Sequence, residues 1–338
     1  MTDNRDFESR IRSLMKSATI PGLSIFTARE GIEHVAASGV RNCDTQEPVN
    51  ALTVFEAASL SKPVLAHAVL QLIDAGRLDL DEPLLRLAGP LVPDDPAAAH
   101  ITTRHVLSHT TGLPNWRRPE FPLRTYFPPG TRFSYSGEGY AYLQTAIERL
   151  MGEPLETTMK RLVLQPFGMH RSSYVWQKSF SENAAAPHDA KGRVGTKFKP
   201  ANANAAYSLH TTAADYGRFL VAVMSKARLK EATARLWTSP QIQTPKRRFE
   251  MLEEGTPETE PRVAWGLGWG VEPDAGTFFH WGANPGATAF VLGAPAERSA
   301  LAVFMNSDVG LDIVPSIIET TMPGPHPSLS WLGLSQKF

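Results

Sequence analysis

The sequence predicts an α+β fold: an antiparallel sheet built from N- and C-terminal segments, flanked by helices, with a large and mostly helical insertion. Short apolar runs separated by turn residues occur near both ends of the chain, and apolar residues at helical spacing fill most of the middle. A length of 338 residues suits one large domain or two interleaved ones. We therefore expect residues 1–58 and 238–338 to form a discontinuous sheet domain, and residues 59–237 to form a helical domain.

The N-terminal segment predicts one helix followed by two strands. Apolar side chains at positions 7, 11, 14 and 15 recur at the spacing of an amphipathic helix, which covers about residues 5–18. Pro21 and Gly22 break this helix. Residues 23–30 and 33–40 then show the composition of two strands joined by a tight turn.

The middle and the C-terminal part of the chain differ in periodicity. Apolar positions at helical spacing predict helices at residues 63–75, 102–108, 138–151, 154–164 and 212–224. After residue 260 the pattern changes to short apolar runs typical of an antiparallel meander, at residues 263–272, 277–282, 287–293 and 299–307. We expect a solvated loop at residues 250–262 and a short helix at about 311–320, followed by a Pro-rich tail.

The composition excludes several classes of function. The 34 Lys and Arg residues balance 34 Asp and Glu residues, so the formal net charge is zero. This balance removes the simplest argument for nucleic acid or an anionic membrane as a partner. No apolar run is long enough to span a membrane, and the charged N-terminus shows no signal peptide. With Cys43 as the single cysteine, these features predict a cytoplasmic location.

Ser59 and Lys62 stand three residues apart at the start of an apolar helix-like run, in "EAASLSKPVLAHAVLQL". Residues at this spacing share one helix face, so the ammonium group can reach the hydroxyl. A serine at a helix N-terminus also lies near free backbone N–H groups and the positive end of the helix dipole, which stabilise an oxyanion. The same spacing occurs at Ser13 and Lys16, where the amphipathic first helix explains it. Ser59 is therefore the candidate nucleophile.

Two further segments supply the other groups that such a serine needs. The G-x-S-x-G motif of the α/β-hydrolases is absent, and Tyr135 in "FSYSGEGYAYL" is the candidate third polar group that relays the proton. In "FFHWGANPG", a predicted strand runs through His280 into small residues, among them Gly282. Small side chains let a substrate lie against the strand edge, and the N–H of Ala283 is a candidate second oxyanion donor.

Together these elements resemble the serine β-lactamase and penicillin-binding-protein superfamily, and most closely its branch of class C β-lactamases, D-peptidases and related carboxylesterases. That family orders its motifs as S-x-x-K, Y-x-N and K/H-x-G. Here the motifs begin at Ser59, Tyr135 and His280. Accessory segments at residues 107–114, 128–140, 165–173 and 211–219 agree, and the resemblance spans about residues 7–310.

The resemblance implies a β-lactamase-like fold with the active site in the cleft between the two domains. It implies a serine hydrolase that works through an acyl-enzyme on Ser59, with Lys62 and Tyr135 sharing the roles of general base and proton shuttle. The N–H groups of Ser59 and Ala283 would form the oxyanion hole, and His280 and Gly282 would flank the substrate. The order in which Lys62 and Tyr135 take the proton stays open.

Two positions depart from the family pattern. Gly137 stands where β-lactamases of this class have the asparagine that holds the lysine and contacts the amide beside a β-lactam. His280 stands where many members have lysine, and a neutral imidazole binds a substrate carboxylate less well than an ammonium does. If the charge of His280 matters, we expect activity on carboxylate-bearing substrates to rise as the pH falls toward 6. Both departures weaken the case for a β-lactamase.

The favoured function is therefore a β-lactamase-like carboxylesterase acting on a small-molecule ester or amide. A D-amino-acid peptidase, an amidase or a β-lactamase are alternatives, and so is an acyl-trapping binding or sensor protein without turnover. The sequence leaves open which acyl group and which leaving group the substrate has, and whether the acyl group passes to water or to another acceptor. It also leaves open the oligomeric state.

Four other aromatic or histidine residues are candidates for a site. We expect Trp281 and Trp116 to line a pocket, although most tryptophans fill cores. His105 and His109 have the spacing of a metal-binding pair, but a third ligand is not evident and a structural role for His109 is favoured. The sequence implies no metal and no organic cofactor.

Overall fold

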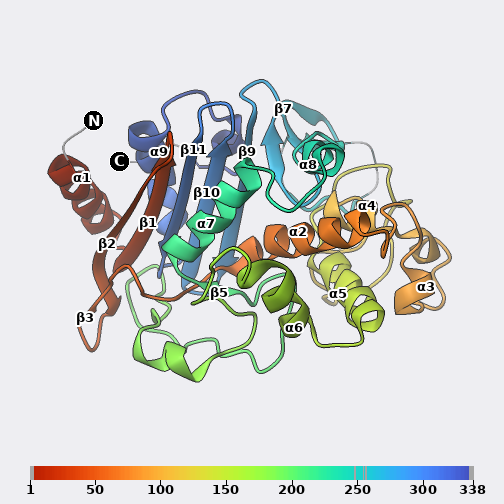
Figure 1. Cartoon of the computed structure of the whole chain (residues 1–338), viewed down its shortest axis with the longest axis horizontal. Coiled ribbons are helices and arrows are strands. Elements are labelled where there is room, and N and C mark those ends of the chain that lie inside the picture. Colours follow the sequence, from red (N-terminus) through yellow and green to blue (C-terminus); the bar gives the residue numbers. More distant parts are fainter. Residues whose placement is uncertain (1–3, 247–248, 254, 256, 335–338) are drawn as a thin grey trace.

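Both ends of the chain contribute strands to one antiparallel sheet. The computed structural model describes residues 4–246, 249–253, 255 and 257–334. In these ranges the main sheet has nine strands, in the order β3-β2-β1-β11-β10-β9-β8-β7-β6 (Figure 1). The strand bounds are β1 Gly22–Arg29, β2 Ile32–Asn42, β3 Glu47–Pro48, β6 Ile242–Pro245, β7 Thr259–Trp265, β8 Gly270–Glu272, β9 Thr277–Asn284, β10 Ala287–Ala294 and β11 Ser299–Met305. A separate two-stranded ladder joins β4 (Phe55–Glu56) to β5 (His210–Thr211).

The pairing of β1 with β11 joins the N-terminal and C-terminal strands. Its register runs from Leu23 opposite Met305 to Arg29 opposite Ser299. Strands β10 and β11 are buried along their whole length, which explains why they appear in the sequence as nearly continuous apolar runs. The predicted antiparallel sheet built from both ends of the chain is confirmed.

Helices cover both faces of this sheet (Figure 1). Their bounds are α1 Asn4–Ser17, α2 Ser61–Asp74, α3 Leu85–Ala88, α4 Thr103–Leu107, α5 Gly137–Met151, α6 Leu155–Met159, α7 Ala213–Met224, α8 Glu231–Trp237, α9 Val314–Thr321 and α10 Pro327–Trp331. On one face an apolar core includes Ile11 of α1, Ile25 of β1 and Ile317 of α9. On the opposite face a second core includes Phe26 of β1 and Val64 of α2. Because successive side chains of β1 point to opposite faces of the sheet, Ile25 and Phe26 belong to different cores.

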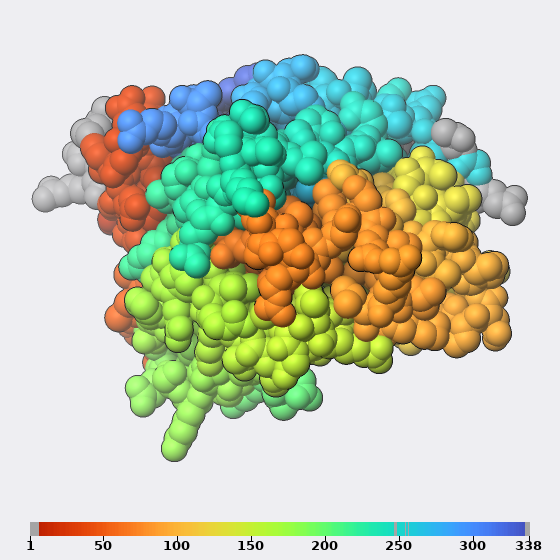
Figure 2. Space-filling model, turned by 45° about the vertical axis from the view of Figure 1, so that its right-hand side comes forward, coloured from red at the N-terminus to blue at the C-terminus, as the bar shows by residue number. Residues whose placement is uncertain are grey.

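Helix α2 lies in the interior of the molecule. Its residues from Ser61 to Leu70 are all buried, as expected for a helix surrounded on every side. In the space-filling view the orange segment that contains α2 lies between the teal segment that contains α7 and the yellow-green segment that contains α5 and α6 (Figure 2). The segment that begins with Ser59 is thus held by both halves of the fold.

Helix α7 belongs by sequence to the predicted insertion, but it packs on the sheet. A Cβ atom at Gly217 would lie 2.2 Å from the ring of Phe26, so the glycine lets the helix approach β1 closely. The division of the chain into domains at residues 59 and 237 stays a prediction.

Three segments differ in detail from the sequence-based expectation. The helix expected at 154–164 is interrupted, because a π-helical turn at Lys160–Leu164 follows α6. The Pro-rich tail contains α10, whose Pro327 suits a first helical turn. The solvated loop expected at 250–262 is wrong in part: Leu252 is buried, and β7 begins at Thr259. Residues 254 and 256 of that loop lie outside the described residues.

Candidate active site

Ser59 lies in a 3₁₀ turn, η1 (Ala58–Leu60), which leads directly into α2. Its neighbour Ala58 has a φ of 47°, in the left-handed region that residues with a side chain rarely adopt. The turn is held in place because the Ser61 hydroxyl donates to the Ala58 carbonyl at 2.6 Å and accepts from the Leu209 N–H at 3.0 Å. The backbone at Ser59 is therefore fixed by contacts with a distant segment as well as by the helix.

Lys62 is buried directly beside the serine. Its Nζ lies 3.0 Å from Ser59 Oγ and 2.9 Å from the carbonyl oxygen of Ala206, and only 1% of the residue is exposed. Burial lowers the pKa of Lys62 well below its ordinary value, because the ammonium form loses its hydration. An amine with a lowered pKa holds its proton less tightly, so its neutral form can accept a proton from a neighbouring hydroxyl.

Tyr135 completes the group predicted from the sequence. Lys62 Nζ lies 4.8 Å from the centre of its ring. The Tyr135 hydroxyl is buried and has no hydrogen-bond partner of ordinary geometry among the described residues. The Ser59 hydroxyl lies near enough to lower the pKa of Tyr135 to some extent. Burial is the stronger effect and raises the pKa of Tyr135. The structure thus brings Ser59, Lys62 and Tyr135 together from two parts of the chain.

His109 lies against Tyr135, a contact that the sequence did not indicate. His109 stacks on Tyr135, with ring centroids 4.1 Å apart and an angle of 29° between the planes. Its Nδ1 accepts the backbone N–H of Ser136 at 3.0 Å, so the proton of the neutral ring sits on Nε2. Burial, with the charge of Lys62, lowers the pKa of His109 well below its ordinary value. The segment "LSHTTGLP" was a family signature, but its spacing does not reveal this contact.

His105 has a separate role from that of His109. It forms a reciprocal capping box with Thr102 at the start of α4. Within the described ranges, the His, Cys, Asp and Glu side chains form no group of three that could hold a metal ion.

Strand β9 lies against the turn that contains Ser59. Its pairing with β8 covers residues 277–279, and its later residues contact η1. A Cβ atom at Gly282 would lie 2.3 Å from the Ala57 carbonyl oxygen and 3.2 Å from Cβ of Ala58. Only glycine allows this approach. The strand edge with Gly282 and Ala283 therefore lies next to the turn that contains Ser59.

His280 is buried on the same strand. Its Nδ1 donates to the Trp281 carbonyl oxygen at 2.7 Å, which leaves Nε2 as an acceptor in the neutral ring. Burial and the charge of Lys62 lower the pKa of His280 to about 3. The expectation that His280 gains a charge near pH 6 is therefore wrong, because the sequence does not show how deeply the ring is buried.

The two tryptophans occupy different environments. Trp281 is buried against the Tyr135 ring at 5.3 Å and against Trp331 at 5.8 Å, so it packs in the core behind Tyr135. Trp116 is 38% exposed and lies against Gly137, at the first residue of α5. Of the two, Trp116 has a face available to a ligand.

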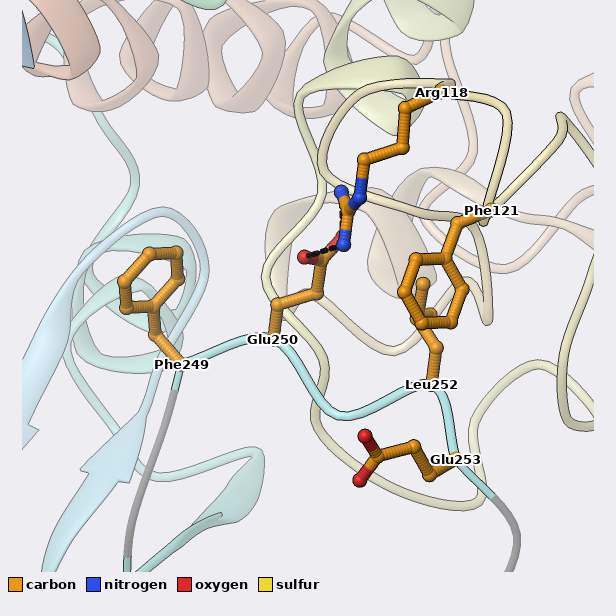
Figure 3. Close-up of a pocket in the computed structure, with 6 residues that line it drawn as sticks. All are labelled: Arg118, Phe121, Phe249, Glu250, Leu252 and Glu253. Carbon is orange, nitrogen blue, oxygen red and sulfur yellow. Dashed lines mark hydrogen bonds and ion pairs between the residues drawn. The ribbon is translucent and has the colours of Figure 1, made fainter.

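The loop at residues 249–253 borders the site. Phe249 meets the edge of the Tyr135 ring at 5.7 Å, and Glu250 accepts from Arg118 at 2.8 Å. Figure 3 shows this ion pair in a pocket of about 280 Å³ lined by Arg118, Phe121, Phe249, Glu250, Leu252 and Glu253. Because Arg118 and Glu250 neutralise each other, the pair holds two loops together.

Comparison with known proteins agrees with this geometry. The model of the family described as beta-lactamase matches residues 7–316. The chain belongs to the beta-lactamase family. This membership confirms the predicted family and the expectation of a serine hydrolase. None of the helices described in this beta-lactamase family member is long and apolar enough to cross a bilayer.

Known proteins that are similar to this beta-lactamase family member include a penicillin-binding protein and an esterase. It is 27% identical to penicillin-binding protein 4 of Amycolatopsis lactamdurans, over 91% of this chain and 86% of that protein. It is 29% identical to esterase EstB of Burkholderia gladioli, over 52% of this chain and 53% of that protein.

Solved structures show the same fold. A class C beta-lactamase has a TM-score of 0.78 and 20% identity, covering 95% of this chain and 96% of that chain. The octameric penicillin-binding protein homologue from Pyrococcus abyssi also has a TM-score of 0.78, with 21% identity, covering 99% of this chain and 79% of that chain. The predicted fold class is confirmed.

Proposed function

We propose that this serine hydrolase is a carboxylesterase that forms an acyl-enzyme on Ser59 and transfers the acyl group of a small ester to water. One observation carries the proposal: a buried lysine with a lowered pKa lies 3.0 Å from the serine hydroxyl. Such a pair activates a serine without a histidine base.

The environments of Lys62 and Tyr135 support different roles in this reaction. The pKa of Lys62 is lowered, so its neutral amine is available to take the Ser59 proton as Oγ attacks the ester carbonyl. The pKa of Tyr135 is raised, so its phenol stays protonated and can pass a proton to the departing alcohol, receiving one from Lys62. In the second half of the reaction, the Lys62 amine takes a proton from water as the water oxygen attacks the acyl carbon. The bond between that carbon and Ser59 Oγ then breaks, the acid leaves, and Oγ receives the proton from Lys62.

The strand edge supplies the remaining parts of the proposed mechanism. The N–H groups of Ser59 and Ala283 would bind the oxyanion that forms on the carbonyl oxygen. Gly282 allows β9 to lie close enough to the serine turn for this purpose. His280 flanks the substrate as a neutral ring, because its pKa is held near 3.

Two features favour an ester over a β-lactam or a D-peptide. Gly137 offers no side-chain amide to a substrate amide, and neutral His280 offers no charge to a substrate carboxylate. The similarity to esterase EstB agrees with an ester substrate. Because the chain is also similar to penicillin-binding protein 4, a D-peptidase or β-lactamase activity is the alternative. The cytoplasmic location, and the absence of nucleic acid and membrane partners, stay predictions from composition.

The test is labelling combined with turnover. A fluorophosphonate should add one adduct, located on Ser59, and Ser59→Ala should lose both the adduct and the hydrolysis of p-nitrophenyl esters while its melting temperature is kept. An adduct on Ser13, or steady turnover by Ser59→Ala, would contradict the assignment. An acyl burst without later turnover would favour an acyl-trapping protein.

A further inference from the structure

Three aromatic side chains form a continuous wall beside the segment whose backbone contacts Lys62. The rings of Trp116 and Tyr207 meet edge to face with centroids 5.5 Å apart. The rings of Tyr207 and Phe198 are 5.7 Å apart and tilted by 34°. Tyr207 directly follows Ala206, whose carbonyl oxygen accepts a hydrogen bond from Lys62 Nζ at 2.9 Å. This aromatic wall (Trp116, Tyr207 and Phe198) therefore begins close to the reactive serine.

Trp116 fills the space that a side chain at position 137 would need. A Cβ atom at Gly137 would lie 2.5 to 2.8 Å from three atoms of the Trp116 indole ring. Such distances do not occur without displacement of one of the two groups. The absence of a side chain at Gly137, two residues after Tyr135, is therefore what leaves room for the Trp116 indole.

The loop that contains Trp116 is firmly held. The carbonyl of Asn115 accepts the N–H groups of Gly137 and Glu138, each at 3.0 Å. Arg117 donates to both carboxylate oxygens of Glu138 at 2.8 Å, in a bidentate pair with defined geometry. An exposed ring on a clamped loop loses little entropy when a ligand covers it.

The aromatic wall leads into a pocket at the end of the β9 edge. The pocket has a volume of about 440 Å³, and the residues that line it include Phe198, Tyr207, Asn284 and Glu56, together with the charged residues Lys197 and Lys199. Asn284 ends β9, and its amide donates to the Glu56 carboxylate at 2.8 Å. A substrate that follows the edge of β9 from Ala283 thus has aromatic rings beside it and a paired polar group ahead of it.

We propose that the aromatic wall binds the acyl group of the substrate and makes the enzyme selective for flat, apolar acyl groups such as aryl-acetyl, over acyl groups that carry an amide. The proposal rests on the proposed function, since it names the acyl group that Ser59 receives. Trp116 is then the residue that determines specificity, because its ring both provides apolar area and excludes a polar side chain at position 137.

The experiment varies the acyl group with a constant leaving group. The kcat/KM values are measured for the p-nitrophenyl esters of acetic acid, phenylacetic acid and N-acetylglycine. In the native enzyme, phenylacetate should be favoured over acetate. Trp116→Ala should reduce this preference about three- to tenfold, as expected for one lost aromatic contact. Ile32→Ala, which removes an exposed apolar side chain from β2, should leave the preference unchanged.

A second pair of variants tests the exclusion at position 137. Gly137→Asn should displace the indole and reduce the phenylacetate preference as Trp116→Ala does. The double variant Trp116→Ala with Gly137→Asn has room for the amide, so its N-acetylglycine to acetate ratio should exceed that of the native enzyme. An unchanged phenylacetate preference in Trp116→Ala, within twofold, would overturn the proposal even if the Gly137 variants do not fold.

Binding without turnover separates this proposal from the proposed function. In Ser59→Ala, p-nitrophenyl phenylacetate should quench tryptophan fluorescence on binding, and adding Trp116→Ala should raise the Kd at least threefold. If the native protein hydrolyses no ester but this Kd difference is found, the carboxylesterase fails and the aromatic wall stands. If esters are hydrolysed and the Kd is the same in both variants, the aromatic wall fails alone.

Discussion

The imidazole of His109 lies nearly flat on the ring of Tyr135, with centroids 4.1 Å apart. Its Nδ1 also accepts the N–H of Ser136, the next residue along the chain. His109 thus holds the ring of Tyr135 and the backbone of the residue that follows it. We infer that His109 is a positioning residue for the Tyr135 hydroxyl.

His109→Ala should therefore lower kcat more than it raises KM. A misplacement of about 1 Å can cost about 10²-fold in rate, so we expect a loss of up to that size. The orphaned Ser136 N–H should also lower the free energy of unfolding by about 1–3 kcal/mol. His109→Phe keeps a ring on Tyr135 and should recover part of kcat. Equal kcat values for the two variants would contradict a role in stacking.

Tyr135→Phe tests the proton relay directly. The change removes one hydroxyl and keeps the ring, so packing against His109 and Trp281 should persist. General acid–base catalysis contributes about 10²–10⁴-fold in rate, and kcat should fall within that range while the melting temperature is nearly kept. A variant with normal kcat would show that Tyr135 only packs.

Lys62 should make stability depend on pH. Burial lowers its pKa in the folded state, so the unfolded chain binds the proton more tightly. The free energy of unfolding should then rise with pH above the folded-state pKa, until the unfolded value of about 10.4 is reached. In Lys62→Met this contribution should vanish.

Urea unfolding at pH 6 and pH 9 measures this difference. The native protein should gain stability relative to Lys62→Met as the pH rises, and ester hydrolysis should increase over the same range because the neutral amine is the base. If the native protein instead lost stability relative to Lys62→Met, the buried amine would be more basic than proposed.

His280 should stay neutral throughout the usual assay range. Because its pKa is lowered to about 3, the ratio of kcat/KM for a succinate half-ester to that for an acetate ester should be flat from pH 8 to pH 5. The two esters share the p-nitrophenol leaving group. A ratio that increased as the pH fell toward 6 would show that the imidazole becomes charged.

Gly282→Ala should move β9 away from the serine turn. The new Cβ would meet the Ala57 carbonyl oxygen at 2.3 Å, and backbone atoms cannot yield as a flexible side chain can. We expect kcat/KM for esters to fall at least about 10²-fold. Gly195→Ala is a matched control, since its Cβ would have no neighbour closer than 3.4 Å. Similar activity in both variants would show that β9 does not shape the oxyanion site.

Local patterns were sufficient for most of the secondary structure. The spacing of apolar residues determined α1 and α7, and the turn residues after 260 determined the strands of the meander. Helix α10 was missed because its five residues are too short for a periodic signal. The π-helical turn after α6 was missed because a single extra residue per turn hardly changes the apolar spacing.

The sequence by itself determined the family and the order of the motifs, and it indicated Ser59, Lys62 and Tyr135 as candidate site residues, because each lies in a short segment of recognisable type. Only the tertiary structure decided how these residues behave. The pKa values of Lys62 and His280 depend on burial by segments far away in the chain. The contact of Trp116 with Gly137 joins a loop to the first residue of α5, 21 residues further along the chain. Desolvation and close packing are properties of the surrounding atoms, so they appear only when the chain is folded.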